Sequence, residues 1–294
     1  MQKHIPVLLQ EVIEILKPDK GIIIDATVGL GGHAKAILEN SKVSFIGMDQ
    51  DGEALELAKE NLKGFQGRVI FLQENFSNLK EVSKEQKILG KVSGIILDLG
   101  VSSLQLAKAE RGFSFQKEGP LDMRMDRKGK LTAYQIINGW PKEELFEILR
   151  DYGEERFAGR ISNAIVTKRR EKKIETTLEL AEIIKSSVPY KYAFRKIHPA
   201  TKTFQALRIA VNQELSNLKK ALEDSLEVLV PQGKIIVISF HSLEDRIVKR
   251  FFKDMQEKSE LKILTKKPVS ATLEEIRVNP RSRSAKLRAA VVTK

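Results

Sequence analysis

The stretch Asp25-Ala-Thr-Val-Gly-Leu-Gly-Gly-His-Ala34 decides how this chain folds. Before it, residues 21–25 form a short apolar run typical of a buried strand, and after it residues 34–39 have helical spacing. The glycines therefore lie in a strand-to-helix turn, because glycine tolerates positive φ and allows a ligand to approach the backbone. Such a turn also directs unpaired helix N–H groups toward a ligand.

The next predicted strand, residues 43–49, ends in an acid that suits a nucleotide site. Asp49 follows Gly29 by 20 residues, the spacing at which an acid reaches a ribose diol. The turn itself matches only the loose pattern G-x-G-x-x-A, which does not specify the ligand. Asp25 beside the turn suits a cation better than a pyrophosphate. We therefore expect S-adenosyl-L-methionine, which carries a sulfonium and an ammonium and no phosphate; a strand, turn and helix without a ligand is the plain alternative.

Two more apolar runs extend the pattern of strands alternating with helices. Residues 68–73 are followed by Phe76, and residues 92–98 end in Asp98. Alternating strands and helices predict a parallel sheet, whose ligands bind at the carboxyl ends of the strands. We expect these end residues to meet at one edge of the sheet. Phe76 is placed there either to pack against an adenine or to fill the core.

Three further strands are predicted at residues 233–240, 261–266 and 287–292, with a helix capped by Ser242 after the first. A closing antiparallel hairpin of the last two is typical of class I methyltransferases and is absent from NAD-binding Rossmann sheets. The predicted fold class is therefore α/β: a class I S-adenosylmethionine-dependent methyltransferase, Rossmann-like and seven-stranded, with an inserted α-helical domain. A nucleotide-dependent oxidoreductase is the rival enzyme.

The insertion is recognised by purely helical patterns after the fourth strand. They cover residues 132–138, 141–152, 154–173 and 177–187. A further long helix is predicted from about Pro199, with an apolar stripe at three- and four-residue spacing as far as Leu222. We expect a core made of residues 1–106 and 213–294, with residues 107–212 as an inserted RNA-recognition domain.

The composition excludes several chemistries. The 294 residues include no cysteine, which excludes disulfides, cysteine zinc sites, iron–sulfur radical chemistry and methylation through a covalent cysteine adduct. The four histidines have no metal-ligand spacing, so no metal is expected. No apolar run approaches a membrane span and no signal peptide is recognisable at the N-terminus. A cytoplasmic protein with no membrane partner is expected.

The net charge of +12 is concentrated in two segments. Residues 104–212 hold 22 basic and 14 acidic residues, and residues 266–294 hold 8 and 2. Nucleic acid is the natural partner for such a distribution, although solvated helix faces are the plain alternative. In the irregular loop 111–127, Phe113 and Phe115 are candidates to stack a splayed base or to pack the loop. The most basic helix offers Lys168, Arg169 and Arg170 to phosphates.

Several long and unusual segments carry a family resemblance. They read DATVGLGGH (25–33), LDLGVSS (97–103), ERGFSF (110–115), GPLDMRMD (119–126), YGEERF (152–157), HPATKTFQALR (198–208), SFHSLEDRIVK (239–249) and NPRSRS (279–284). With these, the chain resembles the small-subunit ribosomal RNA cytosine-N4 methyltransferase H family, also called MraW. The segments run from near the start of the chain to near its end.

The resemblance implies a methyl donor, a target and a set of cofactor-binding residues. The donor is S-adenosyl-L-methionine, and the target is the exocyclic N4 of a cytidine in the decoding region of small-subunit (16S) ribosomal RNA. The expected partner is that RNA in an assembled or nearly assembled 30S subunit, with free RNA as the alternative that the sequence leaves open. The cofactor positions carry over to Gly31, Gly32, His33, Asp49, Phe76, Asp98 and Gln105. His33 and Gln105 enter by resemblance alone.

The chemistry needs an acceptor for a hydrogen of the cytosine amine, whose lone pair is delocalised into the ring. The Asp/Asn-Pro-Pro-aromatic motif that many amino-methylating enzymes use after strand four is absent, and residues 98–103 stand in its place. Asp98, a hydroxyl of Ser102 or Ser103, or the backbone carbonyls there are candidates, with His241 as a second choice. An RNA-binding assembly factor with a vestigial cofactor site is the non-enzyme alternative. The sequence leaves the oligomeric state open.

Overall fold

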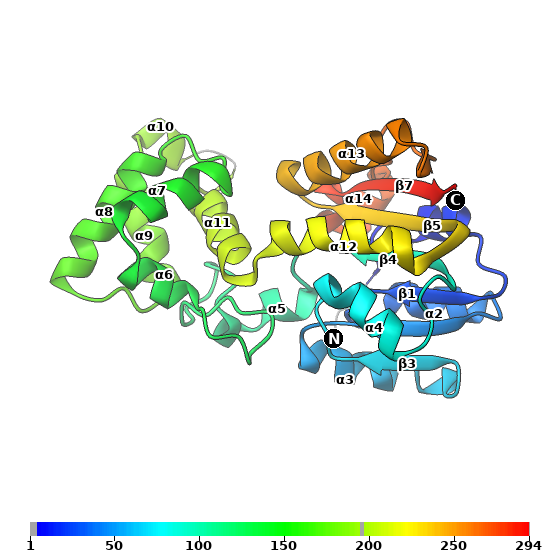
Figure 1. Cartoon of the computed structure of the whole chain (residues 1–294). Coiled ribbons are helices and arrows are strands. Elements are labelled where there is room, and N and C mark those ends of the chain that lie inside the picture. The colour runs from blue at the N-terminus through cyan, green and yellow to red at the C-terminus, as the bar shows by residue number, and fades with distance from the viewer. Residues whose placement is uncertain (1–4, 195–196, 294) are drawn as a thin grey trace. The chain divides into compact units, whose positions relative to one another are not determined.

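The computed structural model describes residues 5–194 and 197–293 of the chain (Figure 1). It divides into two compact units. The sheet unit comprises Met1–Gly100 and Leu215–Lys294, and the helical unit comprises Val101–Glu214. The helical unit thus begins six residues before the predicted insertion and ends two residues after it.

The sheet unit is built on a seven-stranded sheet with the order β3-β2-β1-β4-β5-β7-β6. Neighbouring strands from β3 to β5 are parallel, whereas β7 runs antiparallel to both β5 and β6. An NAD-binding Rossmann sheet has the order 3-2-1-4-5-6, so the reversed β7 decides for the class I methyltransferase fold, as predicted. The strands are β1 Ile22–Asp25, β2 Ser44–Met48, β3 Val69–Leu72, β4 Val92–Asp98, β5 Leu229–Ser239, β6 Leu261–Ile263 and β7 Lys286–Val292.

Helices cover both faces of this sheet, because the apolar residues of its strands alternate between two buried clusters. In β4, Ile95 and Leu97 belong to one cluster and Ile96 to the other. The cluster of Ile96 includes residues of α1 Leu9–Leu16, α2 Gly32–Glu39 and α3 Gly52–Asn61. The cluster of Ile95 includes residues of α4 Leu79–Glu85, α12 Glu214–Val228 and α13 Ser242–Glu257. The short helix α14 spans Leu273–Val278.

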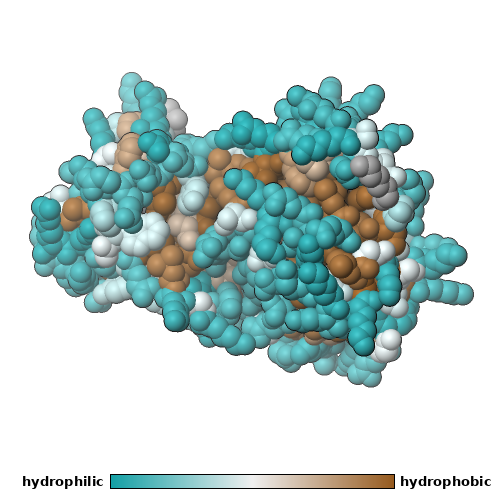
Figure 2. All heavy atoms as spheres, in the orientation of Figure 1, coloured by the Kyte–Doolittle hydropathy of each residue, from teal (hydrophilic) through white to brown (hydrophobic). Residues whose placement is uncertain are grey.

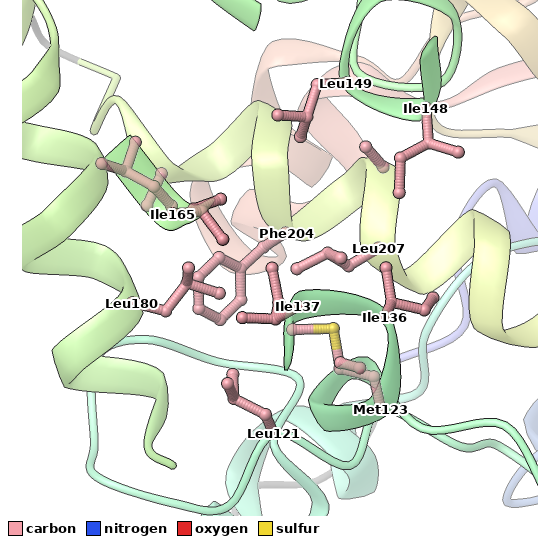
Figure 3. Close-up of a cluster of buried hydrophobic side chains, with 14 of the residues drawn as sticks. Leu121, Met123, Ile136, Ile137, Ile148, Leu149, Ile165, Leu180, Phe204 and Leu207 are labelled. Atoms are coloured by element: carbon pink, nitrogen blue, oxygen red, sulfur yellow. The ribbon is translucent and has the colours of Figure 1, made fainter. Parts of the chain in front are cut away.

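The helical unit has its own apolar core (Figure 3). Side chains from α6, α7, α8, α9 and α11 converge there with Leu121 and Met123, which lie in the loop before α6. This core gives the unit a packed interior independent of the sheet. Its helices are α5 Ser103–Ala107, α6 Ala133–Gly139, α7 Lys142–Asp151, α8 Ala158–Glu171, α9 Thr177–Ser187, α10 Tyr190–Ala193 and α11 Ala200–Asn212.

The single long helix predicted from Pro199 is wrong, because Gln213 interrupts it. Gln213 has a φ of 51°, in the left-handed region, and this conformation ends α11 before α12 begins at Glu214. The apolar stripe is divided accordingly: Phe204 and Leu207 lie in the core of the helical unit, and Leu218 and Leu222 in the core of the sheet unit. Each half keeps helical spacing, so spacing alone cannot reveal the break.

No helix within residues 5–194 and 197–293 has the length and apolar character needed to cross a membrane. Hydrophilic residues cover much of the face shown in Figure 2, with apolar atoms between them.

Candidate cofactor site

Backbone hydrogen bonds tie the glycine turn to β2 and β4, the two strands that flank β1. The Val28 N–H donates to the carbonyl of Met48 at 2.8 Å, at the end of β2, and the Ala26 N–H to that of Ile96 at 2.9 Å, in β4. Gly29 and Gly31 have φ values of 53° and 82°, which a side chain rarely adopts. The turn therefore lies at the carboxyl edge of the sheet, where the sequence predicts a ligand.

Two glycines of the turn are required by protein neighbours. A Cβ on Gly31 would lie 2.9 Å from Cδ1 of Leu62, and one on Gly32 would lie 2.4 Å from Cγ of Pro6. The sequence predicts the close approach of a ligand at these glycines. At Gly31 and Gly32 the atoms that approach closely belong to Leu62 and Pro6. Contact of Gly31 and Gly32 with the cofactor stays a prediction.

Asp49 is bonded directly to the glycine turn. Its Oδ2 accepts the Gly29 N–H at 2.9 Å, and its Oδ1 accepts the Asp51 N–H at 2.9 Å. Asp51 in turn caps α3 by accepting the Glu53 N–H at 3.2 Å. The acid at the predicted ribose spacing is thus held in a fixed orientation beside the turn.

The buried Asp25 and the partly exposed Asp98 form an acidic pair linked through Thr27. The Asp25 Oδ1 accepts the Thr27 N–H at 3.1 Å, and the Thr27 hydroxyl oxygen accepts the Asp98 N–H at 2.7 Å. Burial, with the charge of Asp49, raises the pKa of Asp25 to about 7 against the opposing hydrogen bond from Thr27. Burial and the charges of Asp25 and Glu244 raise the pKa of Asp98 well above its usual range.

His33 is buried between the N-terminal segment and Asp98. Its Nε2 lies 3.0 Å from the carbonyl oxygen of Val7, which can only accept, so Nε2 carries a proton. Its Nδ1 lies 4.0 Å from Oδ2 of Asp98. The structure therefore brings His33, Asp49 and Asp98 to one edge of the sheet with the glycine turn.

The N-terminal segment is the part of this site that sequence reasoning missed. The Leu8 N–H donates to Oε1 of Glu275 at 2.9 Å, and the Asn279 side chain donates to the carbonyl of Ile5 at 3.0 Å. These bonds fasten the segment that carries Val7 against His33. No local pattern could have found them, because the partners are more than 260 residues apart in the chain.

The edge fits a cationic cofactor. Within the described part of the chain, the buried Oδ1 of Asp98 has no hydrogen-bond partner. Burial makes ionisation costly for both Asp25 and Asp98, and neighbouring acids add to that cost: Asp49 at Asp25, and Asp25 with Glu244 at Asp98. A nearby positive charge would therefore stabilise both carboxylates. A sulfonium and an ammonium supply that charge, whereas a pyrophosphate would add repulsion.

Comparison with known proteins identifies the family. A model of the MraW methylase family matches residues 1–293. This chain belongs to the MraW methylase family. A protein of Sulfurihydrogenibium azorense named "Ribosomal RNA small subunit methyltransferase H" is 52% identical over 292 residues, covering 99% of each chain. Proteins of the same name from Persephonella marina and Clostridium botulinum (strain Kyoto / Type A2) are 51% and 49% identical over 292 and 304 residues, covering 99% and 97% of each chain.

The family and the sheet topology together define the class of enzyme. The chain is a methyltransferase with a class I fold, and S-adenosyl-L-methionine is its cofactor. The residues of the carboxyl edge suit that cofactor by charge, as shown above.

Phe76 and Gln105 of the methylase have clear local packing roles. Phe76 is 9% exposed and belongs to the core cluster of Ile46 and Met48, so most of its ring contacts protein. Gln105 lies in the helical unit and completes a capping box with Ser102 at the start of α5, where Ser103 is the first helical residue. Its Oε1 accepts the Ser102 N–H at 3.0 Å. Cofactor contacts of Phe76 and Gln105, and RNA contacts of Ser102 and Ser103, stay predictions.

His241 lies at the N-cap of α13, where the sequence had placed Ser242. Glu244 completes this helix start, because its Oε2 accepts the Phe240 N–H at 2.8 Å. The His241 Nε2 lies 3.2 Å from Oε1 of Glu244, an ion-pair distance without hydrogen-bond geometry. Glu244 is also close enough to raise the pKa of Asp98. The prediction of the cap was wrong by one residue, and His241 has a structural partner in Glu244.

Phe113 is not available to stack a base, which corrects the sequence-based proposal for it. Phe113 is 7% exposed and belongs to the core of the helical unit. Arg111 beside it is buried, and its Nη2 donates to the carbonyls of Arg124 and Met125 at 3.1 and 3.0 Å. The loop is thus held by its own domain. Phe115 stacks on His198 at a centroid distance of 4.7 Å, so one face of its ring is covered.

Arg169 also has a structural role. Its Nη1 and Nη2 donate to the carbonyls of Ile137 and Trp140 at 2.7 and 2.6 Å, which ties α8 to α6. Lys168 is exposed and pairs with Glu171 at 3.1 Å, and Arg170 is exposed. A phosphate contact is therefore open to Lys168 and Arg170, whereas Arg169 is committed to backbone carbonyls.

We expect Asp25→Asn to remove part of the pH dependence of stability. The folded pKa of Asp25 is about 7, whereas an unfolded aspartate titrates near 3.9. Its contribution is therefore full below the unfolded pKa and is lost as the pH rises through the folded pKa. Between pH 5 and pH 8 this loss is about 2–3 kcal/mol.

Denaturant unfolding of the cofactor-free enzyme measures the effect. The asparagine oxygen can still accept the Thr27 N–H but does not ionise. The unfolding free energy of Asp25→Asn should fall less from pH 5 to pH 8 than that of the wild type. Equal decreases for the two proteins would contradict the raised pKa.

Proposed function

We propose that this methylase transfers a methyl group from S-adenosyl-L-methionine to N4 of a decoding-region cytidine in small-subunit (16S) ribosomal RNA. The supporting observation is about 50% identity, over nearly the whole chain, to proteins named "Ribosomal RNA small subunit methyltransferase H". The resemblance of its motifs supports the cytosine N4 target. We propose that the substrate is the assembled or nearly assembled 30S subunit, which places the enzyme in the cytoplasm.

Different residues of the carboxyl edge are proposed to bind different parts of the cofactor. When bound, the cofactor supplies an electrophilic methyl group on a sulfonium. Asp49 is the proposed ribose ligand, which is supported by its spacing from Gly29 and by the Gly29 N–H that orients its carboxylate. Asp25 and Asp98 supply negative charge to a cationic ligand. We propose that His33, which is held by the Val7 carbonyl, positions the Asp98 carboxylate.

Asp98 is the favoured acceptor for a hydrogen of the target amine. Its Oδ1 is buried and accepts no hydrogen bond from the described residues. Its raised pKa makes it a stronger base than an exposed carboxylate, so it can hold the proton released by the amine. His241 is the second candidate, although its ring is paired with Glu244.

Basic residues of the helical unit are proposed to bind RNA phosphates. Lys168→Ala with Arg170→Ala should weaken RNA binding and reduce its salt dependence, because each lost phosphate contact lowers the slope. The matched change Arg169→Ala should instead lower the unfolding free energy by about 1–3 kcal/mol, because the carbonyls of Ile137 and Trp140 lose their hydrogen-bond donor.

Filter binding at several salt concentrations and thermal unfolding separate the two effects. The proposal for Lys168 and Arg170 is contradicted if methylation is lost while RNA affinity and its salt slope stay those of the wild type.

The proposed reaction is tested by methyl transfer from labelled S-adenosyl-L-methionine to purified small subunits lacking modification. Nucleoside analysis should find the label in N4-methylcytidine. Label in another nucleoside would keep the fold and cofactor and overturn the target. Cofactor binding without any label would favour the non-enzyme alternative, an RNA-binding assembly factor.

A further inference from the structure

Two exposed aromatic rings, on Tyr190 of α10 and on its C-cap Phe194, contact each other. Figure 1 shows α10 at an edge of the helical unit. Tyr190 is 77% exposed and Phe194, the C-cap, is 63% exposed. Their ring centroids lie 4.5 Å apart with an angle of 41° between the planes. Aromatic side chains normally bury much of their surface. Two contacting rings that both remain exposed to solvent contribute little to folding and are typical of a binding surface.

The helix geometry turns these two rings outward together. Residues four apart share one face of a helix, so Tyr190 and Phe194 project on the same side. Tyr192, between them, faces the other way and anchors the helix. Its ring packs on Phe157 at 4.8 Å, and its hydroxyl donates to Glu155 at 3.0 Å. The exposure of the outer pair is thus a consequence of how α10 is docked.

Two lysines lie near the pair. Nζ of Lys185, in α9, lies 5.6 Å from the centroid of the Phe194 ring, and Lys191 is exposed. The sequence from Lys185 to Lys196 holds four basic residues and no acidic residue. Exposed aromatics among cations are typical of surfaces that bind single-stranded nucleic acid, since rings stack bases and cations hold phosphates.

We propose that Tyr190 and Phe194 form a stacking platform for an unpaired base of the RNA substrate, with Lys185 and Lys191 contacting its phosphates. This inference rests on the proposed function in taking small-subunit ribosomal RNA as the partner. It replaces Phe113, which is buried, as the aromatic contact of the helical unit.

Binding of unmodified small subunits by the full-length enzyme tests the platform. The double variant Tyr190→Ala/Phe194→Ala should lose between about fivefold and about a hundredfold in affinity, the range for removing base–aromatic stacking. Tyr190→Phe/Phe194→Tyr keeps both rings and should bind like the wild type. Tyr134→Ala, a matched change at a tyrosine of α6 that is 38% exposed, should also bind normally. Thermal unfolding should be unchanged, because both platform rings lie outside the core.

A photo-crosslinker identifies what touches the platform. With p-azidophenylalanine in place of Phe194, irradiation of the complex should crosslink ribosomal RNA at an unpaired base mapped by primer extension. Unchanged affinity of the alanine variant, or crosslinks only to a ribosomal protein or a second copy of the methylase, would overturn the platform. Methylation assayed in parallel separates the two proposals. If the wild type forms N4-methylcytidine but the alanine variant binds with unchanged affinity, the proposed function holds and the platform is overturned. If position 194 crosslinks to RNA but no N4-methylcytidine forms, the platform holds and the proposed function is overturned.

Discussion

Replacing Asp49 by alanine is expected to weaken binding of S-adenosyl-L-methionine by about 10²–10³-fold, since each hydrogen bond to a charged group contributes about 1.5–3 kcal/mol. The carboxylate orients the glycine turn through the Gly29 N–H at 2.9 Å and is the predicted ribose ligand. Its loss removes both the ligand contact and the support of the turn. Isothermal titration calorimetry with the cofactor measures the change.

Two variants control for this result. Asp49→Asn keeps an oxygen that can accept one backbone N–H but lacks the charge, so its affinity should lie between those of alanine and the wild type. Glu56→Ala removes an exposed acid of α3 that pairs with Lys59, and it should bind the cofactor normally. Unchanged affinity in Asp49→Ala would show that the acid is structural only.

Asp98→Asn is expected to lower kcat by about 10²–10³-fold at saturating cofactor, because a positioned proton acceptor contributes about that much. The active form is the carboxylate, so wild-type activity should rise with pH through the raised pKa of Asp98. Asparagine is nearly isosteric and does not titrate, so this rise should disappear. Methyl transfer to small subunits across the pH range measures both effects, with the cofactor Kd determined separately.

His241→Ala is the matched test of the other candidate. Because the His241 ring is paired with Glu244 at the start of α13, we expect a loss of kcat below about tenfold and an unchanged pH profile. If His241→Ala removes the pH-dependent rise and Asp98→Asn preserves it, the two roles are exchanged.

The fold and the acidic edge could be predicted from local sequence patterns. Short apolar runs define strands, and parallel strands joined through helices must end at one edge of the sheet. Asp25, Asp49 and Asp98, as strand-end residues, are therefore brought together by topology alone. The antiparallel β7 followed from the position of two more runs near the C-terminus. Prediction succeeded where the information lies within a few residues.

Prediction failed where long-range packing decides the role of a side chain. Phe113 and Tyr190 are both aromatic residues near basic ones, yet one is in the core and the other is exposed. Arg169 lies in a basic run, yet its guanidinium binds backbone carbonyls of α6 and its C-cap Trp140. Residue type and spacing do not encode which face of a short helix or loop is covered by the rest of its domain.

The sequence alone established the order of the strands, the cysteine-free chemistry, the excess of basic residues after the fourth strand and the acids at the strand ends, since these depend on composition and on neighbours in the chain. Only the tertiary structure revealed the bond from Val7 to His33, the break at Gln213 and the raised pKa values of Asp25 and Asp98. These depend on contacts between residues far apart in the chain, on one backbone φ, and on burial, which arise when the chain packs.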